Sequence, residues 1–201
     1  PKSEPLKQLM TLFGWTETGS LFGTNIVALS RLFRARLASL VALSALSGYL
    51  FSAHSFSTTS VLVFLAIWLL AAGCSALNQL QEVEIDSRMR RTQTRPLPSG
   101  DLTRRQALLI ASIAMAGGLL LLLSCDLIPL LLGLFAVLWY NGIYTPLKKM
   151  TAWAVFPGAV CGALPPLIGY SAAGGSIFDS AAVILAGTLL IWQVPHFWLL
   201  A

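Results

Sequence analysis

Residues 78–100 have the sequence NQLQEVEIDSRMRRTQTRPLPSG, and they begin at the end of an apolar run at 60–80. A helix needs about 20 apolar residues to cross a hydrocarbon core of roughly 30 Å. The run at 60–80 meets that length, and charged groups are costly inside the membrane. The polar stretch therefore marks the point where a membrane-spanning helix reaches the membrane surface.

The composition of the whole chain agrees with a membrane protein. Of the 201 residues, 56% are hydrophobic and only 10% are charged, and the mean hydropathy is +0.77. Soluble globular domains carry about 25% charged residues. These values exclude an ordinary soluble domain, a disordered chain and a coiled coil.

The remaining apolar runs predict five further spans, and hence an all-α, polytopic transmembrane helical bundle of six spans. Short, nearly uncharged connections alternate with connections rich in Lys and Arg, so all thirteen Lys and Arg residues fall on one side of the membrane. The positive-inside rule places that side in the cytoplasm. Topology thus accounts for the net charge of +5, and we expect no nucleic-acid partner. The predicted spans are 37–53, 60–80, 106–124, 127–145, 152–170 and 179–200.

The N-terminal part of the chain is predicted to lie outside the bilayer. Residues 1–36 form a cytoplasmic or interfacial segment on this interpretation, and residues 37–201 form the transmembrane domain. Residues 1–30 mix apolar, aromatic and polar side chains, a pattern typical of a segment lying along the membrane interface. Because residues 1–20 show no Arg/Ser-rich amphipathic leader, we expect the bacterial inner membrane in preference to the mitochondrial inner membrane.

Three oxygen-bearing side chains lie at helical spacing within the polar stretch. Asn78, Glu82 and Asp86 stand at positions i, i+4 and i+8, so a continued helix rotates only about 40° between one and the next. Mg²⁺ prefers oxygen ligands and completes its shell with water and substrate phosphates. Arginines follow directly, and their guanidinium groups are suited to binding phosphate oxygens. The pattern favours two interpretations about equally: a metal-bound diphosphate site and a solvated cytoplasmic loop. These arginines are Arg88, Arg90, Arg91, Arg95, Arg104 and Arg105.

Three separate stretches together resemble the intramembrane prenyltransferases, and within them the heme O synthase (protoheme IX farnesyltransferase) branch. The resemblance covers roughly residues 30–201. The second and third stretches separate the heme branch from the quinone-pathway branch better than the first does. The stretches are NQLQEVEIDSRMRRTQTRPLPSG at 78–100, YTPLKKMT at 144–151 with GALPPLIG at 162–169, and WQVPHF at 192–197.

The resemblance implies a bundle around a central cavity in which a farnesyl group passes from farnesyl diphosphate to a vinyl group of heme b. It implies Mg²⁺ as the cofactor and the lipid bilayer as the surroundings. It also implies heme A synthase as a possible partner that takes up the product. On this resemblance, Asn78, Glu82 and Asp86 bind Mg²⁺ and orient the diphosphate.

The resemblance also implies roles for five other residues. Arg91, Arg95 and Lys148 would neutralise the diphosphate leaving group. Tyr144 would either donate a hydrogen bond to the diphosphate or act as an aromatic anchor at the membrane interface. His196 would face the heme as a ligand or a proton handler, since ionisable residues inside spans are usually functional.

The chain departs from the family pattern at three points. Ala35 stands where the family has Pro between two basic residues, and Ala154 stands where it has Asn. Family members have about nine spans and a second acidic motif after the sixth, so we expect the C-terminal part of the family fold to be absent from this chain. Two alternatives stay open at this point: a quinone-pathway aromatic prenyltransferase, and a non-catalytic truncated membrane fragment.

Overall fold

The computed structural model describes residues 26–200, with side chains placed over 26–196. Every regular element in this range is helical, which confirms the predicted all-α class. The interfacial segment expected at 1–30 falls mostly outside the described residues, and only its last part is seen, as the start of helix α2. The elements are α2 Ile26–Phe33, α3 Ala35–Ala53, α4 Thr58–Arg88, α5 Arg104–Leu123, α6 Leu127–Leu138, the π-helix Trp139–Tyr144, α7 Thr145–Leu147, the 3₁₀-helix Ala152–Ala154, α8 Val155–Ala172 and α9 Ser180–Leu200.

The described helices have the lengths that a membrane bundle requires. The sixth predicted span corresponds to α9, which is apolar over Ser180–His196. The structure therefore confirms a polytopic helical membrane protein. Five helical segments are candidate membrane spans, and α9 is a further apolar helix of the bundle. The five segments long and apolar enough to cross a membrane are Ala35–Ala53, Thr58–Arg88, Arg104–Leu123, Leu127–Leu147 and Ala152–Ala172.

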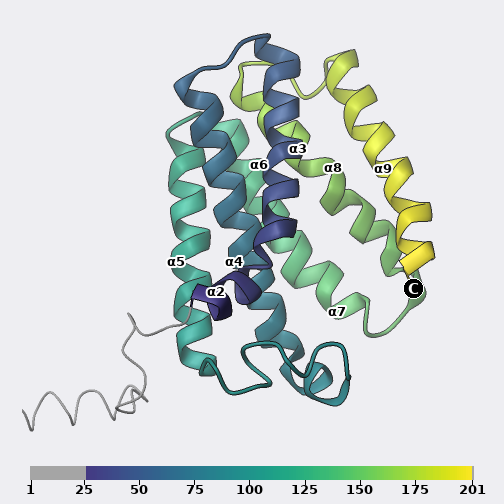
Figure 1. The fold of residues 1–201 in the computed structure, drawn as a ribbon. Coiled ribbons are helices and arrows are strands. Elements are labelled where there is room, and N and C mark those ends of the chain that lie inside the picture. The colour runs from purple at the N-terminus through teal and green to yellow at the C-terminus, as the bar shows by residue number, and fades with distance from the viewer. Residues whose placement is uncertain (1–25, 201) are drawn as a thin grey trace, which may run out of the picture.

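Helix α4 occupies the centre of the bundle (Figure 1). It packs against α3 and α5 along most of its length and also contacts α2, α6 and α8, whereas α5 and α9 lie at opposite edges. The short turns that follow α3, α5 and α8 lie at one end of the bundle. The loop 89–103 and α7 lie at the other end, which we call the charged end because it carries the Arg-rich loop and Lys148.

Small side chains let α3 and α8 come very close together. The buried face of α3 consists of alanines and Gly48, followed by Tyr49. A Cβ atom on Gly48 would overlap the carbonyl group of Pro166, and one on Gly169 would overlap the carbonyl group of Ala45. Helices in lipid associate through such close van der Waals packing, because lipid tails are as apolar as the side chains they replace.

We expect Gly169→Ala to destabilise the bundle by about 1–3 kcal/mol, since the added methyl group must push α3 and α8 apart. Thermal unfolding of the purified protein in detergent measures the effect. Gly187→Ala in α9 is the matched control, because no atom lies within 4 Å of the Cβ position there. A Gly169→Ala variant as stable as the control would contradict the close packing of α3 on α8.

Helix α4 is longer than the apolar run that predicts it. A capping box of Ser57 and Ser60 starts it, and it continues to Arg88, eight residues past the predicted end of the span at Leu80. Glu, Gln and Leu are good helix formers, so the polar stretch continues the helix beyond the apolar run. Asn78, Glu82 and Asp86 therefore all lie on one helix, as their spacing predicts.

The fourth predicted span, 127–145, contains a π-helical turn that the sequence did not reveal. Over Trp139–Tyr144 the helix widens, and the Thr145 N–H donates to the Tyr140 carbonyl, five residues back. Pro146 follows directly, and its ring would clash with the carbonyl four residues earlier in a regular α-helix. The π-turn thus stands where a regular α-helix is disfavoured by the proline, and π-turns are frequent at functional sites.

A candidate diphosphate and metal site at the charged end

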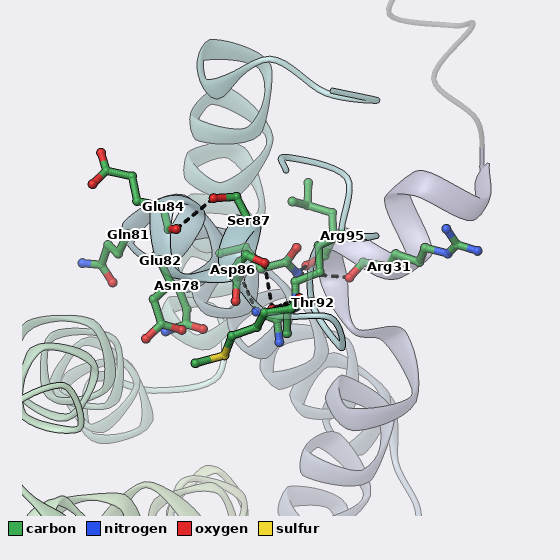
Figure 2. A network of polar contacts seen from close by, with 12 residues as sticks. Arg31, Asn78, Gln81, Glu82, Glu84, Asp86, Ser87, Thr92 and Arg95 are labelled. Carbon is green, nitrogen blue, oxygen red and sulfur yellow. Dashed lines mark hydrogen bonds and ion pairs between the residues drawn. The ribbon is translucent and has the colours of Figure 1, made fainter. Parts of the chain in front are cut away.

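Asn78, Glu82 and Asp86 project from the last turns of α4 at the charged end, and we call these three residues the acidic stripe (Figure 2). Asn78 is 2% exposed, Glu82 8% and Asp86 4%, although all three are polar. Buried charges persist in proteins only when they are paired or hydrogen-bonded. The partners of these three side chains therefore show what the site is built to hold.

Glu82 is paired with a cation from a distant part of the chain. Lys148, directly after α7, places its Nζ 2.9 Å from Glu82 Oε1. The same ammonium lies 5.5 Å from the centre of the Tyr144 ring, within range of a cation–π contact. The structure thus brings together Glu82, Lys148 and Tyr144, three residues for which the family resemblance implies roles at the diphosphate.

The neighbouring lysine fixes the orientation of the Asn78 amide. With the oxygen on that side, Oδ1 accepts from Lys148 Nζ and Thr145 Oγ1, each at 3.1 Å, and Nδ2 donates to Glu82 Oε2 at 3.2 Å. The reverse orientation would set the amide nitrogen against the ammonium, donor against donor. We therefore assign the oxygen to the lysine side, which places two protein oxygens, Asn78 Oδ1 and Glu82 Oε1, around one positive charge.

Thr145 joins the acidic stripe to the π-turn and was not singled out from the sequence. Its side chain is 1% exposed. Thr145 Oγ1 lies 2.9 Å from the Tyr140 carbonyl and 3.1 Å from the Asn78 amide, and its single proton serves one of these acceptors at a time. Gln81 adds a second link, because its Nε2 donates to the Asn141 carbonyl at 3.2 Å. The π-turn therefore holds the last turns of α4 in register.

We expect Thr145→Val to destabilise the protein by about 1 kcal/mol. Valine keeps the shape of the side chain, but the buried Asn78 amide and the Tyr140 carbonyl lose the hydroxyl group as a hydrogen-bond partner. Thr145→Ser, which keeps the hydroxyl group, is the matched control. Unfolding midpoints in detergent compare the two variants with the original protein. Equal losses in both variants would show that the methyl group, and not the hydroxyl, stabilises this contact.

Asp86 is held by the loop that follows α4. Arg95 Nη1 donates to Asp86 Oδ2 at 2.6 Å, and Thr92 Oγ1 donates to the Asp86 backbone carbonyl at 3.0 Å. Leu97 and Leu102 from the same loop are buried in a small core with residues of α2, α4 and α5. The loop is therefore folded back onto α4, and its apolar side chains fix the position of Arg95.

Gln79 connects the stripe to the short helix α2. Its side chain is completely buried, and Nε2 donates to the carbonyls of Arg31 and Leu32 at 3.1 and 2.7 Å. These carbonyls are among the last of α2, where intrahelical partners run out. Arg34 then adopts a left-handed conformation with φ 49°, which separates α2 from α3. A glutamine next to the acidic motif was the only signal of this contact in the sequence.

The other predicted site residues lie apart from these pairs. Arg91 is exposed on the loop 89–103. His196 is exposed on α9, which packs mainly against α8. The predicted roles of Arg91 on diphosphate and of His196 at heme stay predictions.

The donor set fits Mg²⁺ held jointly with a phosphate ligand. Among the residues that the structure describes, no three His, Cys, Asp or Glu side chains form a metal-binding group. The candidate donors are two carboxylates and one amide oxygen, and Mg²⁺ sites commonly use one or two carboxylates with substrate phosphates. The ammonium of Lys148 between Glu82 and Asn78 shows that these two oxygens already accommodate a cation.

Comparison with known proteins identifies the class to which this fold and site belong. Residues 41–201 match the UbiA prenyltransferase family, and the chain belongs to that family. Curated relatives are named protoheme IX farnesyltransferase, which confirms the resemblance to that branch. The relative from Geobacter sulfurreducens is 45% identical over 84% of this chain, and that from Oleidesulfovibrio alaskensis is 44% identical over 87%. The chain spans 62% of the length of each of these two relatives.

Solved structures share the fold. A digeranylgeranylglyceryl phosphate synthase structure matches with a TM-score of 0.75 at 23% identity, over 84% of this chain and 60% of that chain. A UbiA homolog from Archaeoglobus fulgidus, bound to GPP and Mg²⁺, matches with a TM-score of 0.68 at 18% identity, over 84% and 62%. At these identities the likeness establishes the helical architecture alone.

Proposed function

We propose that the protein transfers a farnesyl group from farnesyl diphosphate to a vinyl group of heme b, in a reaction that depends on Mg²⁺. The observation that carries the proposal is the buried stripe of Asn78, Glu82 and Asp86, flanked by Lys148 and Arg95. A buried pair of carboxylates with adjacent cations is the chemistry that a metal-bound diphosphate needs. The names of the relatives support farnesyl and heme as the two substrates.

The residues of the charged end would act on the leaving group. Asn78, Glu82 and Asp86 would hold Mg²⁺, which supplies Lewis-acid stabilisation of the diphosphate. Lys148 and Arg95 would donate hydrogen bonds to diphosphate oxygens as negative charge develops there. Fixed cations at that position stabilise the transition state more than the ground state, which is the requirement for catalysis.

The membrane-embedded part of the bundle would receive the apolar substrates. An allylic cation must be kept from water until the acceptor reaches it, and helices surrounded by lipid exclude water. His196 would face the heme, and Arg91 would assist at the diphosphate. On this proposal the charged end faces the cytoplasm of a bacterial cell, and heme A synthase takes up the product.

Incubation of the purified protein with heme b, farnesyl diphosphate and Mg²⁺ tests the proposal, with the heme product measured by mass spectrometry. We expect the heme vinyl group to gain one farnesyl group and one hydroxyl group, the hydroxyl group coming from a water molecule that loses a proton, with diphosphate released. We expect chelation of Mg²⁺ to stop the reaction. Transfer to an aromatic quinone precursor instead would favour the quinone-pathway alternative. Failure to bind farnesyl diphosphate with Mg²⁺ present would favour a non-catalytic membrane protein.

A further inference from the structure

Each of the two acidic side chains of the candidate site, Glu82 and Asp86, forms an ion pair with a cationic side chain of the same protein. Lys148 Nζ lies 2.9 Å from Glu82 Oε1 and 3.1 Å from Asn78 Oδ1, and Arg95 Nη1 lies 2.6 Å from Asp86 Oδ2. These are oxygens that the site would offer to a metal ion. The same two cations are those that the site would offer to a diphosphate. Metal and diphosphate therefore compete with contacts that the chain already makes.

The cations lie on the outer side of these pairs. The side chains of Lys148 and Arg95 are 28% and 22% exposed, while those of Glu82 and Asp86 are 10% and 5% exposed. Withdrawing a cation without replacement would leave a buried carboxylate uncompensated, which is strongly unfavourable. Either ion pair can therefore break at a low free-energy cost only if another positive charge replaces Lys148 or Arg95 at the carboxylate.

The net charge of the four paired side chains leads to the same requirement for the metal ion and for the diphosphate. Glu82 and Asp86 are each neutralised by one cation, so neither a metal ion nor a diphosphate meets an uncompensated charge on these four side chains. With the carboxylates of Glu82 and Asp86 holding Mg²⁺, Lys148 and Arg95 would be available to donate hydrogen bonds to diphosphate oxygens. Each ligand prepares the cluster for the other, which is positive coupling in the thermodynamic sense.

We propose that Lys148 and Arg95 gate the acidic stripe, so that the divalent cation and the diphosphate bind cooperatively by exchanging partners with the two internal ion pairs. This inference rests on the proposed function and adds to it the order imposed on ligand binding. Lys148 is the more informative of the two gates, because its ammonium occupies the position between two candidate metal ligands.

Titration calorimetry of the purified protein tests the gate, with Mg²⁺ and inorganic diphosphate as the probes. Mg²⁺ is titrated with and without diphosphate, and the association of the two probes measured without protein is subtracted. In the original protein we expect diphosphate to tighten Mg²⁺ binding by about 10-fold to 100-fold, the usual range for coupled sites. Equal Mg²⁺ affinity with and without diphosphate would overturn the proposal, and this measurement needs no variant.

Lys148→Met should tighten the binding of Mg²⁺ alone by about 10-fold, because Glu82 then lacks its internal partner, and should abolish most of the coupling. Lys149→Gln is the matched control, since Lys149 is the adjacent cation and its Nζ donates to the Gln81 backbone carbonyl, at 2.9 Å. The control should bind both probes like the original protein. Unchanged or weaker Mg²⁺ binding in a folded Lys148→Met variant would overturn the gate.

The same titrations separate this inference from the proposed function. If the original protein binds neither probe, the proposed function fails and the gate fails with it. If both probes bind but bind independently, the metal and diphosphate site stands and the gate alone is wrong.

Discussion

On the proposed function, Asp86→Asn is expected to lower farnesyl transfer by about 10³-fold or more while leaving the protein inserted in the membrane. The asparagine keeps the shape of the side chain and can still accept a hydrogen bond from Arg95, but it loses the negative charge that a metal ion requires. Losing one preorganised electrostatic contact at a reacting group typically costs 10²–10³-fold in rate, and a lost metal ligand costs at least as much. Turnover with heme b and farnesyl diphosphate at saturating Mg²⁺ measures the effect.

Asp101→Asn is the matched control for this experiment. Asp101 lies in the segment between α4 and α5, is exposed, and undergoes the same loss of one charge. Its turnover should equal that of the original protein. Full turnover in Asp86→Asn would remove the acidic stripe from the mechanism, and equal losses in both variants would point to a general effect of surface charge.

Arg95→Gln is expected to destabilise the protein by about 3 kcal/mol. The substitution leaves the Asp86 carboxylate buried without a cation, and breaking a buried pair from one side costs about 3–5 kcal/mol. The partial exposure of Arg95 places the expected value at the lower end of that range. Unfolding midpoints in detergent measure the loss. Arg90→Gln on the exposed surface of the same segment should change stability by no more than about 0.5 kcal/mol.

A double-mutant cycle tests whether this loss arises from the pair itself. In Arg95→Gln combined with Asp86→Asn, both charges are gone, so the variant should be more stable than Arg95→Gln alone. The difference between the double variant and the sum of the single variants gives the interaction free energy of the pair. Additive losses would show that Arg95 stabilises the loop without help from Asp86.

The sequence by itself determined the helical class, the approximate spans and the residues of the acidic stripe. Apolar runs of about 20 residues can satisfy their backbone polar groups in lipid only as helices, so composition and run length were sufficient for the fold class. The spacing of Asn78, Glu82 and Asp86 placed them on one face because the helical period is a local property. The family motif added Lys148 and Arg95 as neighbours of that face.

Only the tertiary structure decided how these residues are paired and what holds them. Lys148 reaches Glu82 from the turn after α7, more than sixty residues away in sequence. Thr145 contacts Asn78 from the end of a π-turn that no local sequence pattern predicts. Gln79 links α4 to α2 through the backbone carbonyls of Arg31 and Leu32, and the sequence does not indicate which carbonyls a glutamine will contact. Hydropathy and helical period describe each segment alone. Contacts between segments depend on how closely α3, α4, α6 and α8 pack, and that packing is a property of the folded bundle.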